Sequence, residues 1–227
     1  MSRRLNRTVN IASGNLLPIN YPELAAKELP PKDQLFYRIA RMVCRLILLF
    51  FRRWNVSGKE NFPLTGGLVV VSNHVSYWDP VVVVSALDRQ VYFMAKAELF
   101  KIPLLGPLIV RFGAFPVQRR GFNRQSIRYA LNLLRSQRIV GIFPEGTRSR
   151  TNNLLPPHEG AVALALKAKV PILPVALIGT RGIRSKVRVK IGRPLNISGL
   201  EGNKVKEGEY QKFSKKIMEE IERLINE

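Results

Sequence analysis

The segment "NHVSYWDP", residues 73–80, places a histidine and an aspartate five positions apart, directly after the apolar run "GGLVVVS". A carboxylate that orients an imidazole makes a general base, because the carboxylate decides which ring nitrogen carries the proton. On a continuous helix five positions are a rotation of roughly 140°, so the side chains of His74 and Asp79 would point apart. They can meet only if the segment between them is a turn. Pro80 favours a turn, because it biases Asp79 away from helical backbone angles and suits the start of a helix over residues 79–87.

This segment alone leaves a structural alternative open. Asp79 could be only the N-cap of the following helix, and His74 could be a histidine held by structural hydrogen bonds. The chain has two histidines and one cysteine. His158 stands apart, and the acidic residues do not cluster with it, so we expect no metal site.

Polar side chains also follow two other apolar segments. "GIFPEGTRS" (141–149) and "GAFPVQRRG" (113–121) both end in polar turns, and these turns carry Glu145, Gly146, Thr147, Arg148, Arg119 and Arg120. In open α/β sheets, ligands bind where several strand ends meet. Arginine forks suit a phosphate group. We therefore expect a general base beside an anion-binding site.

Four segments, in this order, resemble the four sequence blocks of the glycerolipid acyltransferases: "NHVSYWDP", "GAFPVQRRG", "FPEGTRS" and "VPILPVAL". The likeness is greatest to the branch of 1-acyl-sn-glycerol-3-phosphate acyltransferases. It spans about Val56 to Ile191, which is most of the chain. Four blocks in sequence are far more specific than any one of them alone.

The resemblance implies an O-acyltransferase that moves a fatty acyl group from an acyl thioester to the sn-2 hydroxyl of 1-acylglycerol 3-phosphate, giving phosphatidic acid. His74 would take the hydroxyl proton and Asp79 would hold His74. The acceptor phosphate would bind to Arg119, Arg148 and Lys96, and the site would be shaped by Glu145, Gly146, Thr147 and Pro174. Trp78 would either line the site or pack.

No acyl-enzyme intermediate is expected. The chain has no Gly-x-Ser-x-Gly elbow, and its single cysteine, Cys44, lies in an apolar run. The co-substrate would be an acyl thioester of coenzyme A or acyl carrier protein, and no cofactor is implied. Other acceptors stay open, namely another lysolipid or glycerol 3-phosphate itself.

Short apolar runs alternate with helical patterns from Leu68 onward, which predicts an α/β fold with a mixed, largely parallel central sheet flanked by helices. Strands are expected over 67–72, 91–96, 113–118, 139–145, 171–179 and 186–192, and helices over 122–137 (with Asn123 as N-cap), 158–169 and 206–227. The strand over 186–192 alternates strictly between apolar and basic residues. We therefore place it at a sheet edge or beside a membrane surface.

Residues 34–55 predict an amphipathic helix at a membrane interface, between an irregular arm (1–33) and the acyltransferase domain (56–227). The polar face is basic, within roughly 60° of arc, and the opposite face is wide and apolar. The residues expected to bind the membrane are Arg38, Arg41, Arg45, Arg52 and Trp54. The arginines interrupt the apolar run, so it is not the uncharged stretch of about 18 residues that a spanning helix needs. The alternative is a soluble helix packed on the core.

The charge balance points to an anionic partner. The 227 residues include 37 Lys and Arg against 16 Asp and Glu, a net charge of +21. An anionic membrane would explain this excess, with the protein peripheral or monotopic on the cytoplasmic face of the cell membrane. A nucleic-acid-binding protein is the remote alternative, but no zinc-finger spacing or aromatic RNA-binding motif is present, so no nucleic acid is expected.

Overall fold

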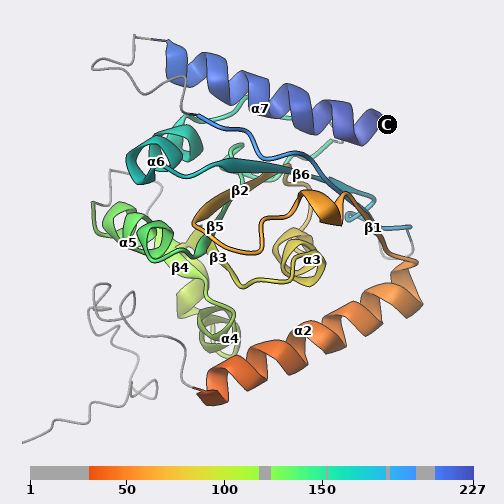
Figure 1. The fold of residues 1–227 in the computed structure, drawn as a ribbon. Coiled ribbons are helices and arrows are strands. Elements are labelled where there is room, and N and C mark those ends of the chain that lie inside the picture. Colours follow the sequence, from red (N-terminus) through yellow and green to blue (C-terminus); the bar gives the residue numbers. More distant parts are fainter. Residues whose placement is uncertain (1–30, 118–123, 152, 183–184, 198–207) are drawn as a thin grey trace, which may run out of the picture.

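The computed structural model describes residues 31–117, 124–151, 153–182, 185–197 and 208–227, with side chains from residue 34 onward. A seven-stranded sheet lies at its centre, in the order β1-β7-β6-β2-β5-β3-β4 (Figure 1). Its strands are β1 (Asn55–Ser57), β2 (Leu68–Ser72), β3 (Val91–Lys96), β4 (Phe115–Val117), β5 (Ile139–Ile142), β6 (Ile172–Ile178) and β7 (Arg188–Ile191). The pair β6–β7 is antiparallel and all the other pairs are parallel. The expected mixed, largely parallel sheet is confirmed.

Helices cover both faces of this sheet. They are α2 (Pro31–Arg52), α3 (Asp79–Ala86), α4 (Leu105–Arg111), α5 (Arg124–Arg135), α6 (Gly160–Ala168) and α7 (Glu209–Asn226), with short 3-10 helices η1 (Lys59–Asn61) and η2 (Ala97–Lys101). The expected helices over 79–87, 122–137, 158–169 and 206–227 are confirmed, although Asn123, the expected N-cap, lies outside the described residues. The elements β1, η1, η2 and α4 were not expected from the sequence.

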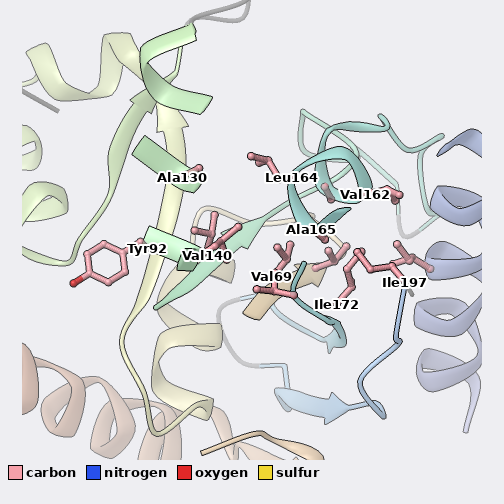
Figure 2. Packing of buried hydrophobic residues seen from close by; sticks show 14 of the residues in the cluster. Val69, Tyr92, Ala130, Val140, Val162, Leu164, Ala165, Ile172 and Ile197 are labelled. Carbon is pink, nitrogen blue, oxygen red and sulfur yellow. The ribbon is translucent and has the colours of Figure 1, made fainter. Parts of the chain in front are cut away.

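Strand β2 explains why the molecule has two cores. All five of its residues are buried, and successive side chains on a strand point to opposite faces. Val69 and Val71 pack on the face covered by α5, α6 and α7, as the close-up of this cluster shows for Val69 (Figure 2). Leu68 and Val70 pack on the other face, where α3 covers the sheet and α2 lies outside α3 (Figure 1). A strand buried on both faces needs an unbroken apolar run, which is what the sequence shows here.

The placement of the 186–192 strand at a sheet edge is wrong. β7 lies between β6 and β1, and the three residues of β1 pair with it in parallel, with Val56 opposite Val189. The alternation itself is real, since Val189 and Ile191 are buried and Arg188 is exposed. A short strand with one apolar residue is too weak a pattern to be found by periodicity, so the true edge strand was missed.

Three arginines of helix α2 that were expected to bind the membrane, Arg41, Arg45 and Arg52, turn toward the protein. The guanidinium group of Arg41 donates to the carbonyl oxygen of Leu87 (2.9 Å). Arg45 donates to the carbonyl of Ser85 (2.7 Å) and pairs with Asp88 (2.9 Å), which lowers the pKa of that carboxyl group. These acceptors lie at the carboxyl end of α3, where unpaired carbonyl groups attract cations.

Arg52 is the most deeply placed of these arginines, with 8% of its surface exposed. It donates to the carbonyl oxygens of Gly179 (2.9 Å), Thr180 (3.4 Å) and Ser185 (3.2 Å) and so ties the end of α2 to the loop after β6. Trp54 is half-buried and packs against the second core. Of the expected membrane-binding residues, Arg38 alone is fully exposed.

The opposite face of α2 is apolar and uncovered. Its exposed side chains are Leu35, Ile39, Met42, Val43, Leu46, Ile47, Leu49, Phe50 and Phe51, and both phenylalanines are 74% exposed. Within the described part of the chain, no helix combines the length and apolar character required to cross a bilayer.

Replacing Arg52 with methionine is expected to lower the free energy of unfolding by about 1–3 kcal/mol, because it strips donors from buried carbonyl groups. Chemical denaturation followed by circular dichroism measures this change. Arg53→Met is the matched control: Arg53 is the next residue and is exposed, so its loss should cost within about 0.5 kcal/mol. An equal decrease in the free energy of unfolding for Arg52→Met and Arg53→Met would contradict the structural role of Arg52.

Candidate active site

The turn after β2 brings His74 and Asp79 together. The Nδ1 atom of His74 lies 2.8 Å from Oδ2 of Asp79. Asp79 is completely buried, whereas 17% of the His74 side chain is exposed. Because an ionised carboxylate only accepts hydrogen bonds, this contact favours the tautomer of the neutral imidazole with the proton on Nδ1 and the lone pair on Nε2. This is the state that a general base requires.

Asp79 does not cap its own helix, so the structural alternative of an N-cap is excluded. Its Oδ2 atom accepts hydrogen bonds from the backbone amides of Val75 (2.6 Å) and Ser76 (2.7 Å), in the turn before α3. No side-chain hydrogen bond caps the start of α3. The carboxylate therefore holds the turn and the imidazole at the same time, and this explains why the turn is tight.

An aromatic ring also packs against the face of the His74 imidazole. Phe143, which directly follows β5, stacks on His74 with ring centres 4.1 Å apart, and Phe93 of β3 stacks on Phe143 at 5.2 Å. The histidine is thereby fixed by a hydrogen bond at one atom and by a ring at its face. This role of Phe143 was not expected from the sequence, although Phe143 stands in the segment "FPEGTRS".

Glu145 joins the turn after β5 to the histidine. Its Oε1 atom accepts from the backbone amide of His74 (2.8 Å) and its Oε2 atom from that of Leu155 (2.9 Å). Burial raises the pKa of Glu145, an effect that these two amides oppose. A second contact joins the two turns, since the amide of Ser149 donates to the carbonyl of His74 (2.8 Å). The role implied for Glu145, shaping the site, thus has a geometric basis in the backbone of His74.

Arg148 lies across the ring of Tyr77, with its guanidinium carbon 3.4 Å from the ring centre. Tyr77 belongs to the turn between His74 and Asp79, so the turns after β2 and β5 also touch here. Lys96 lies at the carboxyl end of β3, exposed and within 3.4 Å of Glu98. Arg119 and Arg120 lie outside the described residues, so their expected place beside Arg148 stays a prediction.

The remaining expected residues occupy different positions around the turn after β5. Gly146 adopts a φ of +64°, and a side chain there would meet the ring of His158 at 2.9 Å, so glycine is required for two reasons. His158 is therefore closer to this turn than the sequence indicated. Thr147 is exposed. Pro174 lies buried inside β6, opposite Val71 of β2.

Two residues near the site were not found from the sequence. The side-chain amide of Asn73 both donates to the carbonyl of Leu177 (2.9 Å) and accepts from its amide (2.8 Å), which locks the end of β2 to β6. Arg181, after β6, donates to the carbonyl of Ser149 (2.5 Å). Their partners lie about 30 to 100 positions away, so no local pattern marks them. Trp78, by contrast, was singled out and is half-exposed.

The contact between His74 and Asp79 is suited to general-base chemistry. Among the described residues, no group of three histidine, cysteine or acidic side chains could hold a metal ion. A surface cavity of about 430 Å³ is lined by residues of β7 and α7, such as Lys190 and Arg223, and does not include the dyad. His74 and Arg148 follow the carboxyl ends of β2 and β5, and Lys96 is the last residue of β3.

The chain is similar to several known proteins. The family model described as "Acyltransferase" matches residues 53–178, which include His74, Asp79, Glu145 and Arg148. A 1-acyl-sn-glycerol-3-phosphate acyltransferase of Bacillus subtilis is 34% identical over 166 residues, covering 70% of this chain and 82% of that protein. One of Streptococcus pneumoniae is 32% identical over 209 residues, covering 86% of this chain and 75% of that protein.

A solved structure shares the fold. The crystal structure of the 1-acyl-sn-glycerophosphate acyltransferase from Thermotoga maritima superposes with a TM-score of 0.71 and covers 90% of this chain and 86% of that chain. Its sequence is 24% identical, so it supports the architecture alone.

Proposed function

The chain belongs to the acyltransferase family, and from this premise we propose that it transfers a fatty acyl group from an acyl thioester to the sn-2 hydroxyl of 1-acylglycerol 3-phosphate. The product is phosphatidic acid. That the chain is an O-acyltransferase follows from its relatives; the acceptor, the donor and the mechanism are the proposal. The observation that carries the mechanism is the 2.8 Å contact between His74 and the buried carboxylate of Asp79.

His74 acts as the general base. Its Nε2 atom takes the proton of the acceptor hydroxyl while the hydroxyl oxygen attacks the thioester carbon. A carbon–oxygen bond forms, the carbon–sulfur bond breaks, and the thiolate receives the proton from His74 as it leaves. Asp79 stabilises the imidazolium that exists between the two proton transfers. No acyl group is attached to the protein at any stage.

Arg148 binds the acceptor phosphate, together with Arg119 and Lys96. The contact between Arg148 and Tyr77 sets this cation against the turn that carries the base. A phosphate bound there leaves the acceptor hydroxyl within reach of His74, and such positioning is a large part of the rate gain in a two-substrate reaction. Glu145, Gly146 and Thr147 form the turn that carries Arg148, and Pro174 supports the neighbouring strand.

The acceptor is tested by supplying one acyl-coenzyme A donor with three acceptors in mixed micelles: 1-acylglycerol 3-phosphate, 1-acylglycerol phosphocholine and glycerol 3-phosphate. We expect 1-acylglycerol 3-phosphate to give the highest kcat/KM, because the other two either shield the phosphate charge or lack an acyl chain. Replacing the donor with acyl carrier protein thioester identifies the donor class. Preference for another acceptor would contradict the proposed substrate while keeping the enzyme class.

The apolar face of α2 holds the protein on the membrane. The face is continuous along the helix, and the inward arginines keep it turned outward by holding α2 on α3. A helix of this kind lies in the interface with its apolar side among the acyl chains. The exposed basic residues add attraction to an anionic leaflet, which places the protein on the cytoplasmic face.

Replacing both Phe50 and Phe51 with serine is expected to weaken binding to vesicles of anionic phospholipid by at least about tenfold, because each buried phenylalanine contributes about 1.5–3 kcal/mol. Flotation of the protein with vesicles measures the change. Leu64→Ser is the control: Leu64 is as exposed as the phenylalanines but lies in the loop before β2. An equal loss of vesicle binding in Leu64→Ser and in the double variant, or no loss in the double variant, would contradict the role of α2.

A further inference from the structure

The stacked pair of Tyr77 and Arg148 has a geometry that suits the positioning of a phosphate ligand. The guanidinium carbon of Arg148 is 3.4 Å from the centre of the tyrosine ring, which is van der Waals contact over the ring face. Arg148 is half-buried, whereas Tyr77 is 73% exposed. An aromatic ring this exposed contributes little to the core, and it belongs to neither of the two core clusters.

Stacking on Tyr77 leaves the N–H groups of the Arg148 guanidinium able to donate hydrogen bonds to a ligand. The group donates hydrogen bonds in its own plane, and a ring beneath it occupies only the face. Within the described part of the chain, no hydrogen bond or ion pair joins the Arg148 side chain to another residue. Arg148 is therefore held in place without losing the donors that a phosphate would need.

Hydrogen bonds hold the backbone of the turn that contains Tyr77. The amide of Trp78 donates to the Ser76 hydroxyl (3.2 Å), and that of Asp79 donates to the Ser76 carbonyl (3.3 Å). The Asp79 carboxylate closes the same turn through the amides of Val75 and Ser76. The backbone on both sides of Tyr77 therefore belongs to the hydrogen-bonded turn that holds His74.

We propose that Tyr77 is a positioning residue that fixes Arg148 relative to His74, so that the acceptor phosphate and the catalytic base keep a constant spacing. This inference rests on the proposed function, since it assigns the phosphate to Arg148. Tyr77 acts through Arg148 and touches no reacting atom. The ring face carries the effect and the hydroxyl group does not, because cation–π attraction depends on the face of the ring.

The test compares Tyr77→Leu with Tyr77→Phe in steady-state kinetics. Leucine removes the ring, so we expect KM for 1-acylglycerol 3-phosphate to rise about 3- to 30-fold, with KM for the acyl donor unchanged. Phenylalanine keeps the face, so we expect an acceptor KM within about twofold of wild type. In an Arg148→Ala background, Tyr77→Leu should have no further effect on that KM.

The matched control is Phe213→Leu on α7. It removes another aromatic ring beside a cation, that of Lys216, away from the turn, and should leave both KM values unchanged. Thermal unfolding of every variant separates a positioning effect from loss of folded protein. An unchanged acceptor KM in Tyr77→Leu would overturn the proposal. Equal losses in the leucine and phenylalanine variants would overturn it too, because the hydroxyl would then be the active part.

A binding measurement keeps this inference separate from the proposed reaction. Phosphorus NMR titration of glycerol 3-phosphate gives its Kd without turnover. We expect Tyr77→Leu to weaken this binding by a factor similar to the rise in KM, and Tyr77→Phe to leave it intact. If wild type bound this probe but acylated none of the acceptors, the proposed function would fail, and the Kd comparison would still decide the role of Tyr77. Binding that is equal in wild type, Tyr77→Leu and Arg148→Ala would contradict the inference.

Discussion

His74→Ala is expected to lower kcat by about 10²- to 10⁴-fold with little change in either KM, because it removes the general base and leaves the binding groups in place. Acyl transfer from a labelled thioester to 1-acylglycerol 3-phosphate measures the loss. His74→Phe should be equally inactive, since it keeps a ring against Phe143 but has no nitrogen to accept the proton.

The control for the histidine is the other histidine of the chain. His158→Ala should keep activity within about twofold of wild type, because the His158 side chain is exposed and makes no contact with Asp79 within the described residues. Thermal unfolding and circular dichroism establish that each variant is folded. Folded His74→Ala protein with more than a tenth of wild-type kcat would refute the base mechanism.

Asp79→Asn is also expected to lower kcat by about 10²- to 10⁴-fold, although this variant keeps the imidazole of His74. All three hydrogen bonds that the structure gives this carboxylate reach Oδ2, and the other oxygen is buried without a partner. An asparagine oxygen can take the place of Oδ2, so the turn can form. What is lost is the negative charge that stabilises the imidazolium once His74 holds the substrate proton.

Asp88→Asn is the matched control for this substitution. Asp88 follows the other end of α3, is exposed, and pairs with Arg45 rather than with any group of the site. We expect activity within about twofold of wild type. The double variant His74→Ala, Asp79→Asn should be no slower than His74→Ala alone, because the two residues act as one unit. If the kcat losses of the two single variants multiplied in the double variant, Asp79 would have a function independent of His74.

The turn that joins His74 to Asp79 could be predicted because its signals are local. Pro80 and the five-position spacing favour a turn, and the apolar run before His74 marks a buried strand. Six of the seven strands were found in the same way. What the local pattern could not supply was the identity of long-range partners, such as Phe143 on the imidazole and Leu177 on the amide of Asn73. These contacts depend on which strands become neighbours in the sheet, and β2 and β5 are separated by two intervening strands in the chain.

Helix α2 shows a second limit. Its periodicity correctly divides the helix into a basic face and an apolar face, but periodicity does not say which face turns toward the protein. Arg45 and Arg52 turn inward because the carbonyl groups of Ser85 and Gly179 offer acceptors that an apolar face could not satisfy. Glu145 is a similar case: the sequence indicated that it shapes the site, but not that its two oxygens accept from the backbone amides of His74 and Leu155.

The measurement that tests the central claim most directly follows the acyl label in a single turnover. Wild-type protein in excess is mixed with labelled acyl-coenzyme A, with and without 1-acylglycerol 3-phosphate, and quenched with acid at short times. If His74 activates the acceptor hydroxyl for direct transfer, label moves from the thioester to phosphatidic acid only when the acceptor is present, and none precipitates with the protein. Label bound covalently to the protein without acceptor, which then moves to the lipid when acceptor is added, would contradict the mechanism.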